Sequence, residues 1–223
     1  MTSLIQERIS QVRASLPDSV RLIAVSKQVP VDAIREAYAA GVRDFGESRI
    51  QEAATKQAQL QELTDITWHF IGHLQSNKAK KALEQFQWIH SVDSLKLARR
   101  LNELAGELSI SPDICLQVKI LPDPDKSGWN VAQLLQELSE LNQLENLQIK
   151  GLMTIPPLGL DNLEILKVFH STHELAEKIQ QQNWSNIQIQ ELSMGMSSDY
   201  QLAVQAGATM IRLGTILFGE RRY

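Results

Sequence analysis

The sequence predicts a (β/α)8 barrel, and three observations support that fold class. Along its 223 residues, eight short β-rich segments alternate with longer segments of helical periodicity. No strand-to-helix turn carries the G-x-G-x-x-G fingerprint of the common open-sheet alternative. Polar and ionisable residues gather just after the mostly apolar strands, as they do at the mouth of such a barrel.

The eight predicted strands are short apolar runs, and longer helical segments separate them. In chain order they cover Arg21–Ser26, Val42–Phe45, Ile66–Ile71, Trp88–Val92, Ile114–Ile120, Leu147–Met153, Ile187–Leu192 and Met210–Leu213. This alternation extends from one end of the chain to the other without a linker, a low-complexity segment or a solenoid repeat. We therefore expect a single domain over residues 1–223.

The predicted helices show apolar residues at helical spacing. Residues 1–16 form the first, and Ser3 with Gln6 resembles a capping box. The helix after the first strand follows Pro30 and stops at Gly41, which are typical start and stop residues. The other helices are expected at Ile50–Leu63, 75–86, Ser94–Leu108, Val131–Leu141, 161–182 and Tyr200–Gly207.

Composition excludes several classes of protein. The net charge is −4 and both signs are interleaved, which argues against a nucleic-acid binder, so Lys78, Lys80 and Lys81 are interpreted as a solvated helix face. The one cysteine, Cys115, lies in an apolar run and is expected to be buried. Neither a secretory apolar segment nor a bilayer-spanning run is present, so we expect a soluble cytoplasmic protein. Because the sequence predicts no second domain, we also expect a monomer.

Lys27 follows the first strand directly, at the face where β/α barrels carry their active sites. A lysine at the barrel mouth can lose part of its hydration, which favours the neutral amine. A neutral amine can attack a carbonyl group and form an imine. The alternative is a structural lysine that extends to solvent or pairs with Glu47 or Asp199.

The loops after the last two strands predict a phosphate site. β/α barrels often bind phosphate between these loops, through backbone amides and a helix N-terminus. Here Gly195, Ser197 and Ser198 precede a helix, and Gly214 and Thr215 follow the final strand. Ser198 alone could be an N-cap and Gly214 a turn residue, but their joint occurrence at the expected places favours phosphate.

A lysine that forms an imine beside a phosphate site has two common explanations, a sugar-phosphate aldolase and a pyridoxal phosphate site. Arg212 favours the second, because a cation beside the ring would hydrogen-bond the pyridine nitrogen. His69 and His73 have H-x-x-x-H spacing, but they lie on a strand and its end. Since the sequence offers no third ligand, we interpret them as structural or pocket-lining histidines rather than metal ligands.

Six segments of the chain resemble the pyridoxal phosphate homeostasis proteins, the YggS/PROSC family, and in particular its cyanobacterial branch. These segments are Ala24–Lys27, Phe45–Glu47, His69–Lys78, Gly151–Ile155, Leu192–Asp199 and Arg212–Gly219. The motifs are long and ordered, and the resemblance covers essentially the whole chain. It implies a barrel like the N-terminal domain of alanine racemase.

The resemblance also implies a set of cofactor contacts. Lys27 would carry pyridoxal 5′-phosphate as a Schiff base, and Arg212 would meet the pyridine nitrogen. The residues implied to hold the phosphate are Ser197, Gly214 and Thr215, and those implied to line the pocket are Asn77 and Met153. The family usually reads F-G-E-N-Y after the second strand. Here Ser48-Arg49 replaces the Asn-Tyr pair, so no contact is assigned to that loop.

The role implied by the resemblance is regulatory. The family buffers pyridoxal phosphate and affects amino-acid and keto-acid pools, with no established catalytic turnover, and apo-enzymes that need the cofactor are candidate partners. The competing hypotheses are an amino-acid racemase or decarboxylase and an aldolase without cofactor. A racemase would need a second base, and none of Tyr38, Tyr200 and Tyr223 is obviously placed to supply it.

Overall fold

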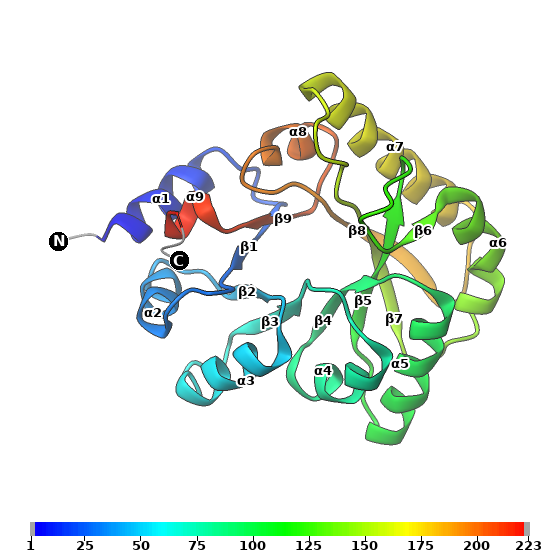
Figure 1. Cartoon of the computed structure of the whole chain (residues 1–223), viewed down its shortest axis with the longest axis horizontal. Helices are drawn as coiled ribbons and strands as arrows, with labels where there is room; N and C mark the ends of the chain where they lie inside the picture. Colours follow the sequence, from blue (N-terminus) through cyan, green and yellow to red (C-terminus); the bar gives the residue numbers. More distant parts are fainter. Residues whose placement is uncertain (1–2, 221–223) are drawn as a thin grey trace.

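Eight parallel strands close into a barrel in the computed structural model, which describes residues 3–220 (Figure 1). Around the ring the order is β1-β2-β3-β4-β5-β7-β8-β9, and the ring is closed by the pairing of β9 with β1 and of β4 with β5. The ring strands are β1 (Arg21–Val25), β2 (Asp44–Glu47), β3 (Thr67–Phe70), β4 (Trp88–Val92), β5 (Asp113–Lys119), β7 (Gln148–Met153), β8 (Ile187–Ser193) and β9 (Met210–Leu213).

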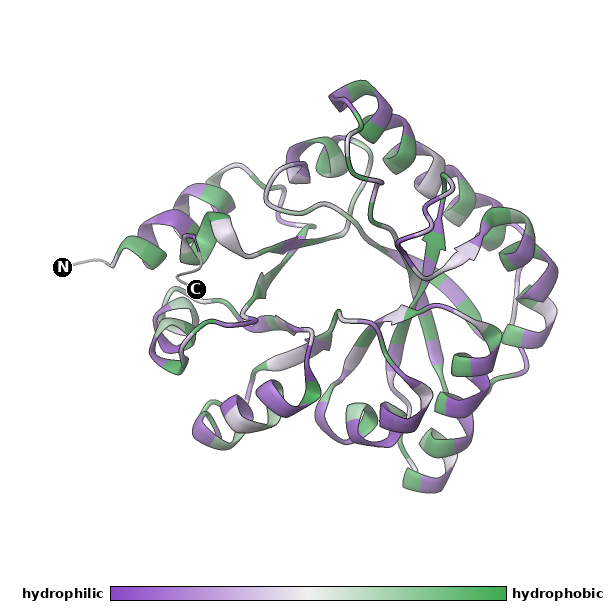
Figure 2. Ribbon diagram, in the orientation of Figure 1, coloured by the Kyte–Doolittle hydropathy of each residue, from purple (hydrophilic) through white to green (hydrophobic). Residues whose placement is uncertain are grey.

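Helices surround the strands and follow them along the chain (Figure 1). They are α1 (Leu4–Ala14), α2 (Val31–Ala39), α3 (Ile50–Gln59), the 3-10 turn η1 (Ser76–Lys78), α4 (Ala79–Gln85), α5 (Leu95–Leu108), α6 (Val131–Leu141), α7 (Asn162–Gln180), α8 (Tyr200–Gln205) and α9 (Thr215–Phe218). In α5, Leu97, Leu101 and Leu104 are buried and share one helical stripe, whereas Arg99 and Arg100 are exposed. Figure 2 shows this mixture of hydrophobic and hydrophilic residues on the helices.

The alternation of strands and helices was predicted correctly, and several local signals are confirmed. The Ser3 hydroxyl accepts from the Gln6 backbone N–H at 3.2 Å, and the Gln6 side chain accepts from the Ser3 N–H at 3.0 Å. The predicted Val42–Phe45 strand was wrong by two residues, since β2 runs from Asp44 to Glu47. The shift places Glu47 inside the barrel wall rather than in the following loop.

One short strand was not predicted. β6 (Trp129–Asn130) pairs with Val118 and Lys119 of β5 on the outside of the ring. Trp129 is buried, and its indole N–H donates to Glu137 at 2.7 Å. Two residues are too few to show a periodicity in sequence, and this is why the strand was not predicted.

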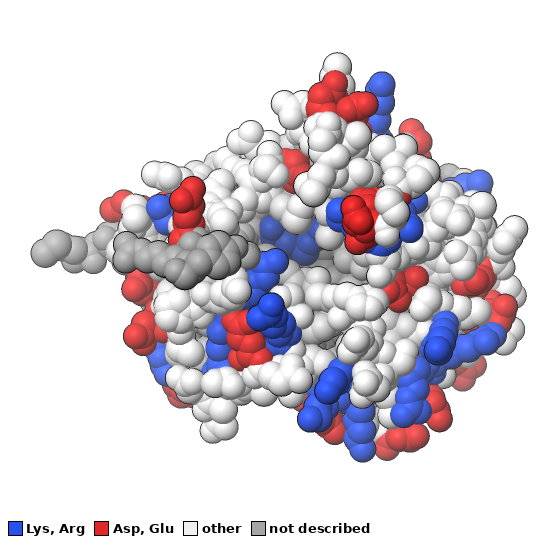
Figure 3. Space-filling model, viewed as in Figure 1, with Lys and Arg blue, Asp and Glu red and all other residues white. Residues whose placement is uncertain are grey.

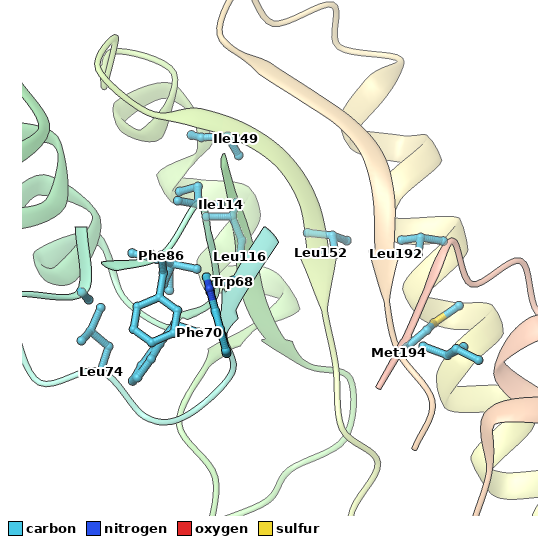
Figure 4. Close-up of a cluster of buried hydrophobic side chains, with 14 of the residues drawn as sticks. Trp68, Phe70, Leu74, Phe86, Ile114, Leu116, Ile149, Leu152, Leu192 and Met194 are labelled. Atoms are coloured by element: carbon cyan, nitrogen blue, oxygen red, sulfur yellow. The ribbon is translucent and has the colours of Figure 1, made fainter. Parts of the chain in front are cut away.

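The hydrophobic core has two parts. The larger part lies between the strands and the helices, and Figure 4 shows a section of it around Trp68, Phe70 and Phe86. A smaller cluster consists of Ile23, Trp88, Cys115, Met153 and Met210. Cys115 is fully buried as expected, and burial raises the pKa of its thiol. Within residues 3–220, no helix is both long enough and apolar enough to cross a bilayer.

Candidate functional site

A cavity of about 320 Å³ lies at the carboxyl ends of β1, β8 and β9. Its lining consists of Val25, Lys27, Ile71, Ile155, Met196, Ser197, Ser198, Arg212, Gly214 and Thr215. The cavity therefore brings together six of the eight cofactor-binding residues predicted from the sequence. Its volume is at the low end of the range typical for small-molecule sites, roughly 300–1,000 Å³. Figure 3 shows basic side chains beside a central hollow on the face viewed.

Lys27 is half-buried after the end of β1, and an ionic network around the buried Lys56 holds the residues on both sides of it. The Lys56 ammonium donates to the Ser26 carbonyl at 2.6 Å and to the Glu47 carboxylate at 2.8 Å. On the other side, the backbone N–H of Gln28 donates to Glu52, which also accepts from Lys56 at 2.6 Å. Gln28 adopts a φ of 60°, a conformation that non-glycine residues seldom adopt without support.

Glu47 and Asp199, the two alternative partners of Lys27, have structural roles of their own. Glu47 is fully buried, and burial raises its pKa although hydrogen bonds from Lys56 and Ser26 oppose the shift. Asp199 accepts a hydrogen bond from the Met196 N–H at 2.6 Å and so shapes the loop after β8. Lys56 was not recognised from the sequence, although the Glu52–Lys56 pair at i,i+4 on a helix was a visible signal.

The two loops predicted to bind phosphate meet at the cavity. The Ser197 hydroxyl accepts from the Gly214 N–H at 3.3 Å and from the Ile216 N–H at 3.5 Å. Gly195 has a φ of 92°, and a Cβ there would lie 2.6 Å from Ala203, so only glycine fits this turn. Ser198 lines the cavity, while Asp199 rather than Ser198 is the N-cap residue of α8.

Arg212 lines the cavity from β9 and is almost completely buried. Its guanidinium donates to the Ser193 hydroxyl at 2.6 Å and to the Thr154 carbonyl at 3.2 Å. Burial lowers the pKa of Arg212 to about 10, so the group remains a cation near neutral pH. Ser193 and Thr154 were not predicted as its partners, because neither a strand-end serine nor a backbone carbonyl is distinctive in sequence.

Two predicted pocket residues lie outside the cavity lining. Asn77 is exposed in the turn η1 and does not line the cavity. Met153 is buried in the smaller apolar cluster, against which the cavity residue Ile155 packs. Ser48 and Arg49 do not line the cavity either, and Arg49 is exposed at the start of α3.

His69 and His73, the two histidines singled out by their spacing, differ in exposure. His69 is fully buried, whereas 62% of the His73 side chain is exposed and its ring lies 3.3 Å from Asp93. Among residues 3–220, no group of three or more histidine, cysteine or acidic side chains could hold a metal ion. Neither Tyr38 nor Tyr200 lines the cavity, and Tyr223 lies outside the described residues.

Comparison with known proteins identifies the family. The protein-family model for the alanine racemase N-terminal domain matches residues 2–222 of this chain. A protein of Synechocystis sp. named pyridoxal phosphate homeostasis protein is 54% identical over 212 residues, which cover 95% of this chain and 96% of that protein. The chain belongs to the family of pyridoxal phosphate homeostasis proteins.

Solved structures agree with this assignment. PipY of Synechococcus elongatus PCC7942 was determined without PLP and with PLP bound. The form without PLP superposes with a TM-score of 0.94 at 59% identity, covering 96% of this chain and all of that one. The form with PLP bound has a TM-score of 0.92 at 58% identity, with the same coverage. Alanine racemase of Clostridium difficile, at a TM-score of 0.78 and 16% identity, shares the fold, and this chain spans 56% of its length. The predicted fold class is therefore confirmed.

Proposed function

We propose that this protein binds pyridoxal 5′-phosphate as a Schiff base on Lys27 and contributes to homeostasis of that cofactor. The observation that carries the proposal is that Lys27, Arg212 and the Ser197–Gly214 loop pair line one cavity. Support also comes from the PLP-bound form of PipY, which is 58% identical to this chain. We further propose that residues 1–223 act as one cofactor-binding barrel domain.

The donors around the cavity match the three polar parts of the cofactor. The Lys27 amine can bond the aldehyde carbon, with release of water. The hydroxyls of Ser197 and Thr215 and the backbone beside Gly214 can hold the phosphate. Arg212 can donate to the pyridine nitrogen. Bound in this way, the cofactor supplies an electron sink whose strength depends on the protonation of its ring.

We infer binding and release of the cofactor rather than efficient catalysis. The buried cation of Arg212 disfavours protonation of the neighbouring ring nitrogen, and an unprotonated ring is a weaker electron sink. Among the described residues, the cavity lining contains no tyrosine that could act as a second base opposite Lys27. The homologous proteins are likewise named for homeostasis and not for a reaction.

The proposed role is to hold the reactive aldehyde and deliver it to apo-enzymes in the cytosol, with consequences for amino-acid and keto-acid pools. A reversible imine in an accessible cavity suits this role, and we expect the protein to act as a monomer. Mixing the loaded protein with an apo-enzyme should restore that enzyme's activity. Turnover of a common amino acid at an ordinary enzyme rate, of order 1–10³ per second, would instead identify a racemase or decarboxylase.

Borohydride reduction followed by peptide mass spectrometry tests the covalent assignment. The purified protein should be yellow, and reduction should attach the cofactor mass to the peptide that contains Lys27. Lys27→Ala should lose the imine absorption but retain some cofactor through the phosphate loops, whereas Lys80→Ala, which changes an exposed lysine of α4, should resemble wild type. Recovery of the mass on another lysine would contradict the proposal.

A further inference from the structure

A chain of hydrogen bonds crosses the barrel from one end to the other and ends at Arg212. Its five members come from five strands and are Asp44, His69, His90, Ser193 and Arg212. The His69 ring lies 2.9 Å from the Asp44 carboxylate on one side and 2.9 Å from the His90 ring on the other. His90 then lies 2.7 Å from the Ser193 hydroxyl, which lies 2.6 Å from the Arg212 guanidinium.

The two ends of this Asp44–Arg212 chain face different cavities. Arg212 lines the cavity at the carboxyl ends of the strands, together with Lys27. Asp44 begins β2 and lines a separate cavity of about 380 Å³, which is also bordered by Arg21 and Arg43. Between these ends, His69, His90 and Ser193 are fully buried, so solvent does not screen the hydrogen bonds that join them.

The Asp44 carboxylate and the Arg212 guanidinium determine which atom donates in each hydrogen bond between them. Burial lowers the pKa of both His69 and His90, so both rings are neutral near neutral pH. A carboxylate only accepts, so His69 donates from Nε2 to Asp44 and leaves Nδ1 as an acceptor. His90 must then donate from Nε2 to His69 and accept at Nδ1 from the Ser193 hydroxyl. Ser193 in turn accepts from Arg212, which can only donate.

We propose that this chain fixes the orientation of Arg212 toward the ring nitrogen of the bound cofactor and transmits the charge of Asp44 to that contact. The inference rests on the proposed function, because it needs the ring nitrogen to lie at Arg212. The positioning residues are Asp44, His69, His90 and Ser193. Hydrogen bonds in series polarise one another in a low-dielectric interior, so a charge at one end alters the donor strength at the other.

Other charged groups also face this chain of hydrogen bonds. Arg21 and Asp113 face His69, and Arg21 also faces His90. Arg21 pairs with Glu191 at 3.6 Å and stacks over Trp88, so it belongs to the wall around the chain. In Asp44→Asn the amide oxygen can still accept from His69, and the variant therefore removes the charge while it keeps the hydrogen bond.

The test uses pyridoxal phosphate labelled with ¹⁵N in its ring, bound to the full-length protein. We expect Asp44→Asn to move the ring ¹⁵N resonance and to change the cofactor dissociation constant about three- to tenfold. Ser193→Ala cuts the chain, so adding Asp44→Asn to it should produce no further change in either quantity. Ser193→Thr keeps a hydroxyl and should restore the response. The control is Asp18→Asn, which removes a carboxylate from the same cavity but outside the chain.

The outcomes separate the two proposals. If the wild-type protein shows neither imine absorption nor a ring resonance of bound cofactor, the proposed function fails. If it shows both but Asp44→Asn behaves as Asp18→Asn does, the chain transmits nothing. Additive effects of Asp44→Asn and Ser193→Ala would also contradict the inference. Thermal melts establish that each variant is folded, and if Ser193→Ala is not, the resonance and affinity of Asp44→Asn alone decide.

Discussion

The Ser197 hydroxyl in the loop after β8 accepts a hydrogen bond from the backbone N–H of Gly214 in the loop after β9, at 3.3 Å. The same oxygen accepts from Ile216 N–H at 3.5 Å. One side chain thus joins the two loops that the proposed phosphate site requires. The distance between these two loops therefore depends on Ser197.

We expect Ser197→Ala to weaken cofactor binding by roughly 1.5–3 kcal/mol, the usual contribution of one hydrogen bond to a charged group. Titration of the apo-protein with pyridoxal phosphate, followed by absorbance, measures the loss. The melting temperature without cofactor reports the separate effect of loosening the two loops. Unchanged affinity would mean that the phosphate lies elsewhere.

We expect Gly214→Val to reduce cofactor affinity more than Ser197→Ala does, because branched methyl groups would block the approach of the phosphate to the backbone. A Cβ at Gly214 would lie 3.5 Å from Val25, which is ordinary contact, so Gly214→Ala should fold normally and serves as the matched control. Equilibrium dialysis of the three proteins gives the comparison. Wild-type affinity in Gly214→Val would remove Gly214 from the site.

We expect Lys56→Met to destabilise the protein by about 3–5 kcal/mol, since it leaves the buried Glu47 carboxylate without its cation. Adding Glu47→Leu should recover much of this loss, because the pair is then replaced by apolar groups. Urea denaturation of the single and double variants measures both effects. The single variant should also form less imine, because Ser26 and Gln28 lose the network that flanks Lys27.

We expect acid to destabilise the protein through His69 and His90. Burial lowers the pKa of both below the ordinary value of 6.5, so the unfolded chain takes up these protons before the folded protein does as the pH falls. The free energy of unfolding should then fall by up to about 1.4 kcal/mol per pH unit for each histidine. NMR of the imidazole carbon-bound protons should show that both rings titrate below the ordinary range in the folded protein. A ring that titrates at or above pH 6.5 would refute the expectation.

Three carboxyl groups act in the opposite sense at lower pH. Burial raises the pKa of Glu47, Asp113 and Asp199, so the folded state binds these protons more tightly than the unfolded chain does. Their contribution grows as the pH falls toward the range where carboxyl groups titrate. The histidine effect is therefore best measured between about pH 7.5 and 5.5, above most of that range.

The sequence predicted the barrel and most residues that line the candidate site's cavity, because both follow from position along a strand. Lys27, Ser197 and Arg212 could be assigned to the mouth since strand ends converge there. Met153 shows where this rule fails. It ends β7, but its side chain packs among apolar residues below the cavity.

The partners of the buried polar residues could not be predicted in the same way. The sequence spacing suggested a relation between His69 and His73, whereas in the structure His69 contacts His90 on β4 and Asp44 on β2. The His90–Ser193 contact joins strands that are not neighbours in the ring. Such contacts depend on strand tilt and barrel diameter, which no local pattern encodes.

The pairing of β1 with β9 also constrains how the protein is made. Ala24 lies opposite Leu213 in this parallel pairing. During synthesis β1 leaves the ribosome first and β9 last, so one edge of β1 has no hydrogen-bonding partner until β9 has been made. Until then β1 offers unpaired backbone groups to any other chain, and a contact so distant in sequence forms slowly. We therefore expect newly synthesised protein to depend on chaperones until β9 has emerged, and truncation before Met210 to yield aggregates rather than an open barrel.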